Sequence, residues 1–217
     1  MSATPFIQFI APTTLDGYDR TRPSTEQPDH IPKTFLDAIS VREAVFVKEQ
    51  SVPIEHEFDS DDPRACHWVI YASVNPIGTI RLVPFPHPPH PQPGGRYAAV
   101  DRATTYHDGV EPYIKLGRLA VLKEFRGAGI SKLLANAAIS WAVAELGMEK
   151  LGASGPDEIP LWNGLTCVHA QEQVASVWAK WGFKVDEGMG MWWEEGIKHV
   201  GMFLRVNIEP APIPGSI

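Results

Sequence analysis

The sequence predicts one mixed α/β domain, of the α+β kind, in which helices cover both faces of a mostly antiparallel sheet. Segments of alternating apolar residues are interleaved with segments of helical periodicity. The 217 residues are 44% hydrophobic and 21% charged, which is typical of a globular chain rather than a disordered one. Only two cysteines are present, so the core must come from the seven Trp, nine Phe and five Tyr and not from a disulfide framework.

The two ends of the chain carry no periodic pattern. Residues 1–33 hold scattered Pro, Thr and Asp, and residues 207–217 show no alternation. We therefore expect an N-terminal extension over 1–33, the domain itself over 34–206, and a C-terminal tail over 207–217. Both ends are expected to drape over the domain or to leave it.

The first helix is predicted over residues 34–50. Thr34 and Asp37 stand where a capping box would close its start. Its apolar positions recur at helical spacing. The side chains expected to face inward are those of Phe35, Ala38, Ile39, Arg42, Val45 and Phe46.

A β-hairpin is predicted next. Residues 67–74 and 77–84 are rich in β-branched and aromatic side chains and are separated by Asn75 and Pro76. The following segment, 84–112, is dense in proline, which removes backbone donors and excludes a helix or a central strand. We expect a long insertion loop there.

A strand, a short turn and a helix form the predicted centre of the domain. The strand is expected over 113–122 and the helix over 128–146. The helix residues expected to face inward are Ile130, Leu133, Leu134, Ala137, Trp141 and Ala144. A loop rich in Gly, Pro and Asp follows.

The C-terminal part predicts a strand over 165–170, a helix over 174–181 and two further strands. Gly182 suits the left-handed position at the end of the helix. Trp192 and Trp193 are adjacent in a strand, so their side chains must point to opposite faces and at most one can lie in the core.

Charge limits the classes of partner. The formal net charge is −7, which argues against nucleic acid and against an anionic membrane surface as partners. No apolar stretch approaches the length of a membrane span, and the N-terminus lacks the pattern of a secretory signal. We expect a cytoplasmic protein, and the sequence leaves a homodimer open.

The turn over residues 126–131 carries the most chemical information. Gly127 and Gly129 leave backbone N–H groups unobstructed at a helix N-terminus, where the helix dipole favours a phosphate. The turn lacks the GK[ST] of a nucleotide-binding P-loop and the third glycine of the dinucleotide fingerprint. The turn therefore predicts that an anion binds here, but it does not indicate a particular class of nucleotide.

This segment resembles the central motif of the GNAT superfamily of acyl-CoA-dependent N-acyltransferases. That motif pairs a Leu-x-Val strand end with [RQ]-x-x-G-x-[GA], and Ser131 departs from the usual Gly or Ala. The resemblance implies a GNAT-like sheet with a splayed central strand pair, acetyl-CoA as the acyl donor, and backbone groups that hold it. The implied cofactor-binding residues are Leu119, Ala120, Val121, Arg126, Gly127, Ala128, Gly129, Ile130 and Ser131.

A second block, residues 169–183, is similar to the strand-then-helix segment of the same family that ends in Gly-Phe. The family often has Asn where Gln171 stands and Tyr where Trp178 stands, so both residues are placed at the cofactor. The tyrosine commonly protonates the departing thiolate, and an indole N–H is too weak an acid for that role. Residues 42–67 and 194–202 also resemble a subgroup of small GNAT proteins.

The implied activity is direct transfer of an acetyl group from acetyl-CoA to the primary amine of a small molecule. The candidate general bases are His199, Glu195 and Glu55, because an alkyl ammonium must lose a proton before it attacks. The acidic stretch 55–62 makes an amino sugar or a polyamine the first expectation for the acceptor. A non-catalytic acyl-CoA sensor and a protein or peptide N-acetyltransferase stay open as alternatives.

No metal is predicted. His87 and His90 lie three residues apart in the proline-rich loop, but no cysteine or carboxylate cluster nearby in the sequence completes a site.

Overall fold

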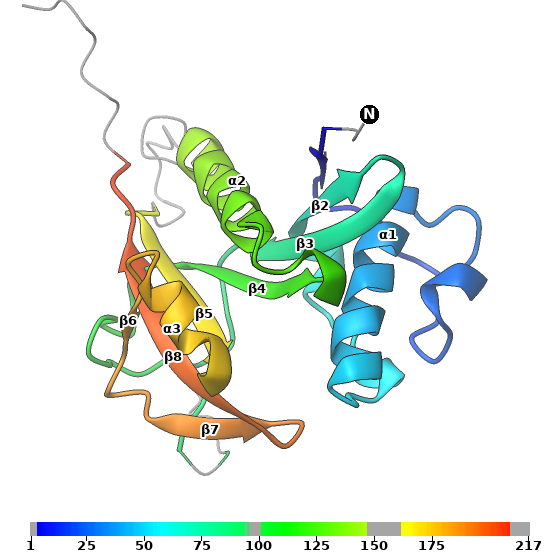
Figure 1. Ribbon diagram of the computed structural model, residues 1–217. Coiled ribbons are helices and arrows are strands. Elements are labelled where there is room, and N and C mark those ends of the chain that lie inside the picture. Colours follow the sequence, from blue (N-terminus) through cyan, green and yellow to red (C-terminus); the bar gives the residue numbers. More distant parts are fainter. Residues whose placement is uncertain (1–3, 94, 96–100, 147–161, 209–217) are drawn as a thin grey trace, which may run out of the picture.

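The computed structural model describes residues 4–93, 95, 101–146 and 162–208. In this part of the chain eight strands form one sheet in the order β1-β2-β3-β4-β5-β8-β6, and β7 pairs with β8 (Figure 1). Only β4 and β5 run parallel. The strands are β1 (Phe6–Ile10), β2 (Cys66–Ala72), β3 (Asn75–Val83), β4 (Ile114–Val121), β5 (Leu165–Gln171), β6 (Lys184–Val185), β7 (Met191–Glu194) and β8 (Ile197–Arg205).

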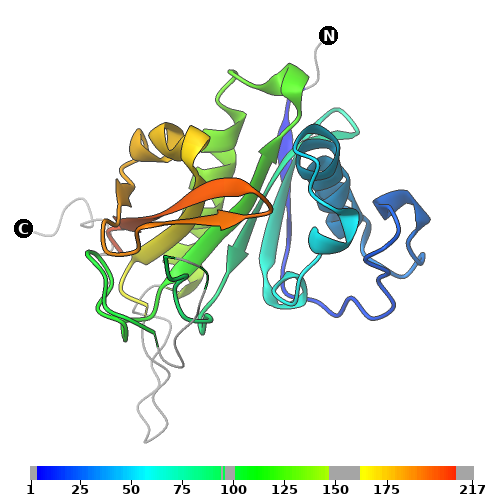
Figure 2. The same cartoon turned by 90° about the horizontal axis from the view of Figure 1, so that it is seen from below.

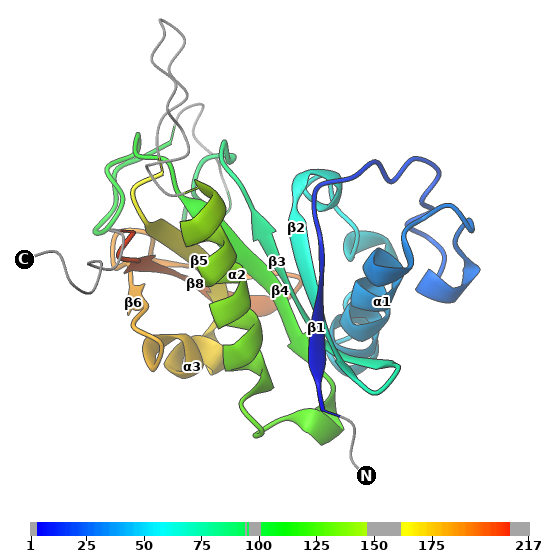
Figure 3. The ribbon, with the colours of Figure 1, turned by 90° about the horizontal axis from the view of Figure 1, so that it is seen from above.

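Three α-helices pack against this sheet: α1 (Lys33–Arg42), α2 (Ile130–Leu146) and α3 (Ala175–Ala179). The helix of α1 continues as a π-helical segment over Glu43–Glu49. Strand β3 explains how helices cover both faces, because alternate side chains point to opposite sides. Ile80 and Leu82 pack with Leu134 of α2, whereas Arg81, between them, shares the Asp62 carboxylate with Arg42 of α1. Figures 1 and 3 show α1 and α2 on opposite faces of the sheet.

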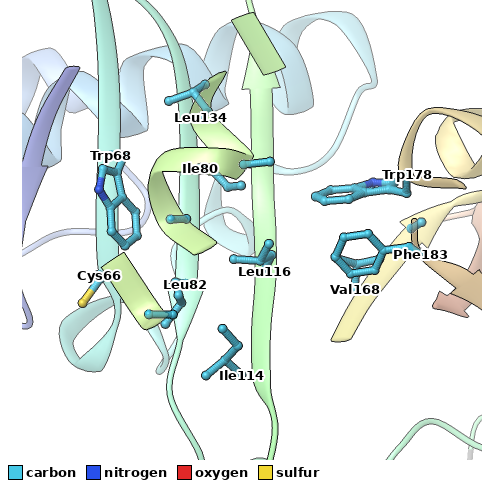
Figure 4. Packing of buried hydrophobic residues seen from close by; sticks show 14 of the residues in the cluster. Cys66, Trp68, Ile80, Leu82, Ile114, Leu116, Leu134, Val168, Trp178 and Phe183 are labelled. Atoms are coloured by element: carbon cyan, nitrogen blue, oxygen red, sulfur yellow. The ribbon is translucent and has the colours of Figure 1, made fainter. Parts of the chain in front are cut away.

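The main core lies under α2 and extends to α3. Figure 4 shows that side chains of β2, β3 and β4 pack on one side of β4, and that Val168, Trp178 and Phe183 pack on the other. Burying large apolar side chains of this kind contributes about 1.5–3 kcal/mol each relative to leaving them exposed. This continuous core supports the cleft described below.

The predicted elements are present, with local differences. The capping box is absent, because α1 begins at Lys33 directly after Pro32 and no side chain caps it. The Asp37 carboxylate instead accepts hydrogen bonds from Lys33 Nζ and from the Tyr71 hydroxyl.

The inward face of α2 is also shifted from the prediction. Leu133 is 53% exposed, and Ala144 is exposed as well. The helix packs through the row Ile130, Leu134 and Ala138, which are four residues apart and share one face.

The N-terminal segment is more closely integrated than its composition indicates. Residues 6–10 form β1, which pairs antiparallel with β2 at the edge of the sheet. Leu15 and Ile31 pack with Phe35 of α1 in a separate small core. A short edge strand needs a partner that lies distant in the sequence, so composition alone does not reveal it.

The insertion loop contains neither helix nor strand in its described residues, 84–93, 95 and 101–112. Most of the loop over 147–164 and most of the tail lie outside the described residues, so those two expectations stay predictions. Among the described residues, no helix is long and apolar enough to cross a membrane.

Candidate active site

The central strands separate partway along their length. Strand β4 pairs with β5 only through Ile114–Leu116 opposite Thr166–Val168, and beyond these pairs the two strands diverge. A cleft of about 770 Å³ lies at the divergence. On this side, the backbone of β4 after Leu116 has no strand partner among the described residues, so its polar groups are available to a ligand. The predicted splayed strand pair is confirmed.

A β-bulge in β4 lies beside this divergence. The register between β3 and β4 shifts between Thr79 and Arg81, and Arg118 adopts a φ of +50°. One extra residue reverses the alternation of side chains along the strand. Leu116 and Leu119 therefore both face the core under α2, although they are three positions apart in the strand.

The glycine turn has the geometry that the sequence predicts. Gly127 and Gly129 have φ values of +82° and +78°, a region that favours glycine. Among the described residues, no backbone carbonyl or side chain accepts a hydrogen bond from the amides of residues 127–131. These donors lie at the N-terminus of α2, where the helix dipole favours an anion.

A second cavity of about 250 Å³ adjoins this turn. It shares residues of β4 and α3 with the larger cleft, so the two cavities adjoin each other at the divergence. Most of the predicted cofactor-binding residues line the two cavities: Leu119, Ala120, Val121, Arg126, Gly127, Ile130, Ser131, Gln171 and Trp178. Ala128 and Gly129 lie within the same turn but do not line either cavity.

Arg126 is held in place within the protein itself. Its Nε donates to the carbonyl of Val121 at 2.9 Å, and its guanidinium pairs with the Glu49 carboxylate at 2.8 Å. The side chain thus ties the end of the first helix to the start of the turn. The Glu49 carboxylate partly neutralises the guanidinium charge of Arg126, so that charge is not fully available to a bound anion.

Trp178 and Gln171 approach the cleft from α3 and β5. Trp178 is 5% exposed and packs edge-to-face against Phe183. The side-chain amides of Gln171 and Gln50 exchange two hydrogen bonds of 2.8 and 3.2 Å. This pair joins the two halves of the molecule across the cleft.

His199 lines the cleft from β8, opposite Gln171 in the strand pairing. Its Nδ1 lies 2.9 Å from the carbonyl of Ile197, which can only accept, so Nδ1 carries the proton and Nε2 holds a lone pair. The Glu194 carboxylate lies 4.0 Å from Nε2.

The two adjacent tryptophans of β7 point to opposite faces, as the strand alternation predicts. The ring of His199 stacks on Trp192, which is 5% exposed, whereas Trp193 is 69% exposed.

The two predicted glutamates have different positions. Glu195 lies in the turn between β7 and β8, lines the cleft, and its carboxylate is 2.9 Å from Nδ1 of His56 (Figure 2 shows this hairpin on the face opposite α2). Glu55 does not line the cleft, and its side chain is exposed. The structure therefore does not bring Glu55 to the other candidate bases, because the 3-10 turn Ile54–His56 points it outward.

Three other acids of the stretch, Glu57, Asp59 and Asp62, belong to a largely buried ion network. Asp62 pairs with Arg42 at 2.7 Å and with Arg81 at 2.8 Å, and all three side chains are at most 8% exposed. Burial by itself would raise the pKa of Asp62, but Arg42 and Arg81 outweigh it and hold that pKa well below its usual range. Asp59 pairs with Arg81 and Arg118, and Glu57 pairs with Arg42.

The sequence reasoning missed two groups in the cleft wall, Lys115 and His169. Lys115 lies on β4 and His169 on β5, and both line the cleft. Burial lowers the pKa of both side chains. No carboxylate of the described residues lies within ion-pair distance of Lys115. Alternate residues of a strand share a face, so Lys115 lies on the same face of β4 as Gly117, and His169 on the same face of β5 as Gln171. This alternation is the sequence signal that could have indicated the two side chains.

The comparison with protein families settles the class. Residues 33–162 match the model of the Acetyltransferase (GNAT) family. The chain belongs to this family. It is therefore an N-acetyltransferase of the GNAT family, whose members use acyl-CoA donors, and the resemblance found in the sequence is confirmed.

Relatives of this GNAT chain support the assignment. It is 31% identical over 149 residues to "Uncharacterized N-acetyltransferase YjcF" of Bacillus subtilis (strain 168), covering 69% of this chain and 77% of that one. The fold is similar to that of Escherichia coli ElaA, with a TM-score of 0.56, 16% identity, and coverage of 92% and 99%. It is also similar to an acyl-CoA N-acyltransferase from Pseudomonas aeruginosa, with a TM-score of 0.54, 17% identity, and the same coverage. The predicted fold class is confirmed.

Proposed function

We propose that this enzyme transfers the acetyl group of acetyl-CoA directly to the primary amine of a small molecule, within a complex that holds both substrates. One observation carries the proposal. Two adjoining cavities lie at the divergence of β4 and β5, with the free backbone amides of the glycine turn beside the smaller one and the titratable groups of Glu194 and His199 in the larger one. An amine in the larger cavity and a thioester that extends from the smaller one can meet without a covalent enzyme intermediate.

The proposed reaction balances with this chain's own groups. The amine nitrogen attacks the thioester carbonyl carbon, the C–N bond forms, the C–S bond breaks, and the sulfur leaves as a thiolate. Backbone N–H groups of β4 after the bulge stabilise the negative charge that develops on the carbonyl oxygen. The nitrogen that has attacked loses its surplus proton, and water relays that proton to the thiolate, because Trp178 has no acidic group to offer.

His199 is proposed as the general base. Its Nδ1–H is held by the carbonyl of Ile197, which leaves Nε2 as the proton acceptor on the cleft side. Glu194, 4.0 Å from Nε2, stabilises the imidazolium that forms. Glu195 is a weaker candidate, since His56 already pairs with it at the mouth of the cleft.

The charges in the cleft favour an amino sugar over a polyamine. Asp59 and Asp62, two acids of the stretch that suggested an amino sugar or a polyamine, are paired with arginines and do not offer a free charge to a second ammonium. Lys115 adds a buried N–H donor that suits a hydroxyl or carboxylate beside the reacting amine and opposes a second ammonium. The contact between His56 and Glu195 spans the mouth, which favours a small molecule over a protein substrate.

A thiol-release screen tests the proposal. Purified enzyme with acetyl-CoA is assayed against amino sugars, amino acids, polyamines and peptides, and mass spectrometry identifies the acetylated product. We expect release of free CoA with amino sugars well above the rate with polyamines. Acetyl-CoA binding by calorimetry without thiol release from any amine would favour the acyl-CoA sensor. Preferred turnover of peptides would overturn the small-molecule assignment.

A further inference from the structure

The insertion loop brings together a histidine and carboxylate cluster that is distant in sequence from the catalytic motifs. His90, Asp101 and His107 meet on the face of the sheet opposite α2, against the rings of Tyr113 and Phe203. Their side chains are 0%, 18% and 2% exposed. The sequence analysis found no carboxylate near His87 and His90, and the fold supplies one from eleven residues along the loop.

The three donor atoms converge on one point. Asp101 Oδ2 lies 3.8 Å from His90 Nε2 and 3.8 Å from His107 Nδ1, and the two nitrogens are 2.5 Å apart. Among the described residues, no hydrogen-bond donor is directed at Oδ2 other than these two rings. Each atom lies within 4.8 Å of the others, which is the spacing of a metal-ligand set.

The surrounding hydrogen bonds orient the ligands. His107 Nε2 lies 2.9 Å from the carbonyl of Glu111, so it donates and leaves a lone pair on Nδ1. Asp101 Oδ1 accepts from the amides of His90 and Arg102 at 3.0 and 2.9 Å, which directs Oδ2 toward the rings. Metal-binding histidines usually donate their second N–H to a carbonyl or carboxylate in this way.

We propose that His90, Asp101 and His107 bind a divalent transition-metal ion of the Zn²⁺ class, with its fourth position filled by water. Zn²⁺ binds imidazole nitrogen and carboxylate oxygen at about 2.0–2.2 Å, so tetrahedral ligands lie roughly 3.3 Å apart. Shifts of less than about 1 Å would bring the three atoms to that spacing.

A hydrogen-bonded chain without metal is the competing explanation. In that arrangement the Tyr113 hydroxyl, 3.4 Å from His90 Nδ1, donates to it, and His90 Nε2–H donates to His107. This chain satisfies both rings and does not use the Asp101 carboxylate, which is 18% exposed. Metal titration of the wild type and of an Asp101 variant therefore distinguishes the two explanations.

The consequence of the site is structural. His90 also lies within 4.8 Å of Cys167 and His169, and His169 lines the catalytic cleft. A metal ion at the cluster would fix the loop as a wall behind the acceptor side of that cleft. The ion would take no part in acetyl transfer.

Zinc titration of the full-length protein tests this inference. The protein is stripped with a chelator, dialysed, and titrated with Zn²⁺ by calorimetry, and bound metal is counted by mass spectrometry. We expect one ion per chain. Asp101→Asn and His107→Gln should each weaken binding at least about tenfold. His87→Gln is the matched control, because its ring stacks on Tyr113 in the same loop outside the cluster.

The absence of binding to the wild type would overturn the inference, and so would equal weakening by His87→Gln. Thermal unfolding supplies a second measurement that needs no variant. Zinc at about 100 times its Kd should raise the Tm of the stripped wild type, because a ligand that binds only the folded state stabilises it. An unchanged Tm would also contradict the site. Near-UV circular dichroism confirms that each variant folds.

Discussion

The cofactor side of the cleft is built from one stretch of chain, residues 119–131, together with α3, whereas the acceptor side takes its groups from many separate elements. On the proposed cofactor side, the expected ligands are backbone amides of consecutive residues, so the geometry follows from two glycines and a helix start. On the acceptor side, side chains from β4, β5, β8 and the turn before β8 must be brought together by packing. The comparison teaches that backbone recognition is local and tolerant of sequence, while side-chain recognition depends on the whole fold.

The largest effect is expected on the cofactor side. Gly129→Glu places a carboxylate where the pyrophosphate is expected, so acetyl-CoA binding should fall by at least about 100-fold, from both repulsion and the φ of +78°. A Cβ at this position meets nothing within 4 Å, so the fold should persist. Calorimetry measures the affinity. Gly95→Glu, with a φ of +82° and the same open space, is the matched control.

The next largest effect is expected at the proposed base. His199→Gln should lower kcat by about 10²- to 10⁴-fold at neutral pH, because proton removal from the ammonium is lost. Activity should recover partly as the pH rises, since the fraction of free amine increases. Steady-state rates from pH 6 to about 9.5 measure both. Acetyl-CoA affinity should stay at the wild-type value, and a wild-type pH profile in the variant would assign the base elsewhere.

The ion network should affect stability more than chemistry. Asp62→Asn leaves Arg42 and Arg81 without a shared carboxylate, which should cost about 3–5 kcal/mol of the free energy of unfolding. Asp61→Asn is the control, because among the residues that the structure describes the Asp61 side chain pairs with the half-buried Arg64 alone, and its loss should cost about 1 kcal/mol or less. Urea denaturation at neutral pH measures both differences.

The same network predicts a pH dependence. The pKa of Asp62 is lower in the folded state than in the unfolded state, so its contribution is fully present above the unfolded pKa of about 4. As the pH falls below that value, the unfolded state binds a proton more readily and the contribution is lost. The stability difference between the wild type and Asp62→Asn should therefore shrink below about pH 4. A constant difference would contradict the role of the carboxylate charge.

A smaller effect is expected at Lys115. Lys115→Met should raise the KM for an amino sugar by roughly tenfold, because one charge-assisted hydrogen bond to a neutral oxygen contributes about 1.5–3 kcal/mol. The KM for a polyamine should fall, since an opposing charge is removed. Lys198→Met is the control, because Lys198 pairs with Glu172 outside the cleft. Equal changes for both acceptors would show that Lys115 acts only on packing.

The smallest effect is expected at Trp178. Trp178→Phe should keep at least about half of the turnover, because no proton donor is lost. Trp178→Tyr should equal or exceed the wild type if a hydroxyl can reach the thiolate. Trp181→Phe, which changes a ring that packs on Trp178, is the control for packing. An inactive but folded and cofactor-bound Trp178→Phe would give the indole a direct role.

The elements of the fold were largely predictable because each depends on neighbours in the sequence. The strand over 113–122, the helix over 128–146 and the left-handed Gly182 follow from alternation, helical spacing and the freedom of glycine. The predictions that failed for β1, β6 and Leu133 have one cause, which is contact with parts of the chain that are distant in the sequence. β1 and β6 are short strands stabilised by partners more than 15 residues away, and the exposed Leu133 depends on how α2 is rotated against the sheet.

The candidate site divides in the same way. The glycine turn and the Leu119–Val121 strand end were placed at the cofactor from their motif, because both lie within one strand, turn and helix. Glu55 was placed at the substrate from charge alone, and the structure turns it outward. Lys115 and His169 were overlooked, because nothing in the sequence shows that β4 and β5 are neighbours.

By itself, the sequence determined most of the segments that form strands and helices, the positions of the glycines with positive φ in the turn over 126–131 and at Gly182, and which stretch has free amide donors at a helix N-terminus. Only the tertiary structure decided which charges are neutralised, as when Arg42 and Arg81 engage Asp62, and which side chains converge, as in the cluster of His90, Asp101 and His107. The physical reason is range. Dihedral preferences and periodicity act between residues a few positions apart, whereas burial and ion pairing depend on distances in space that only the packed chain sets.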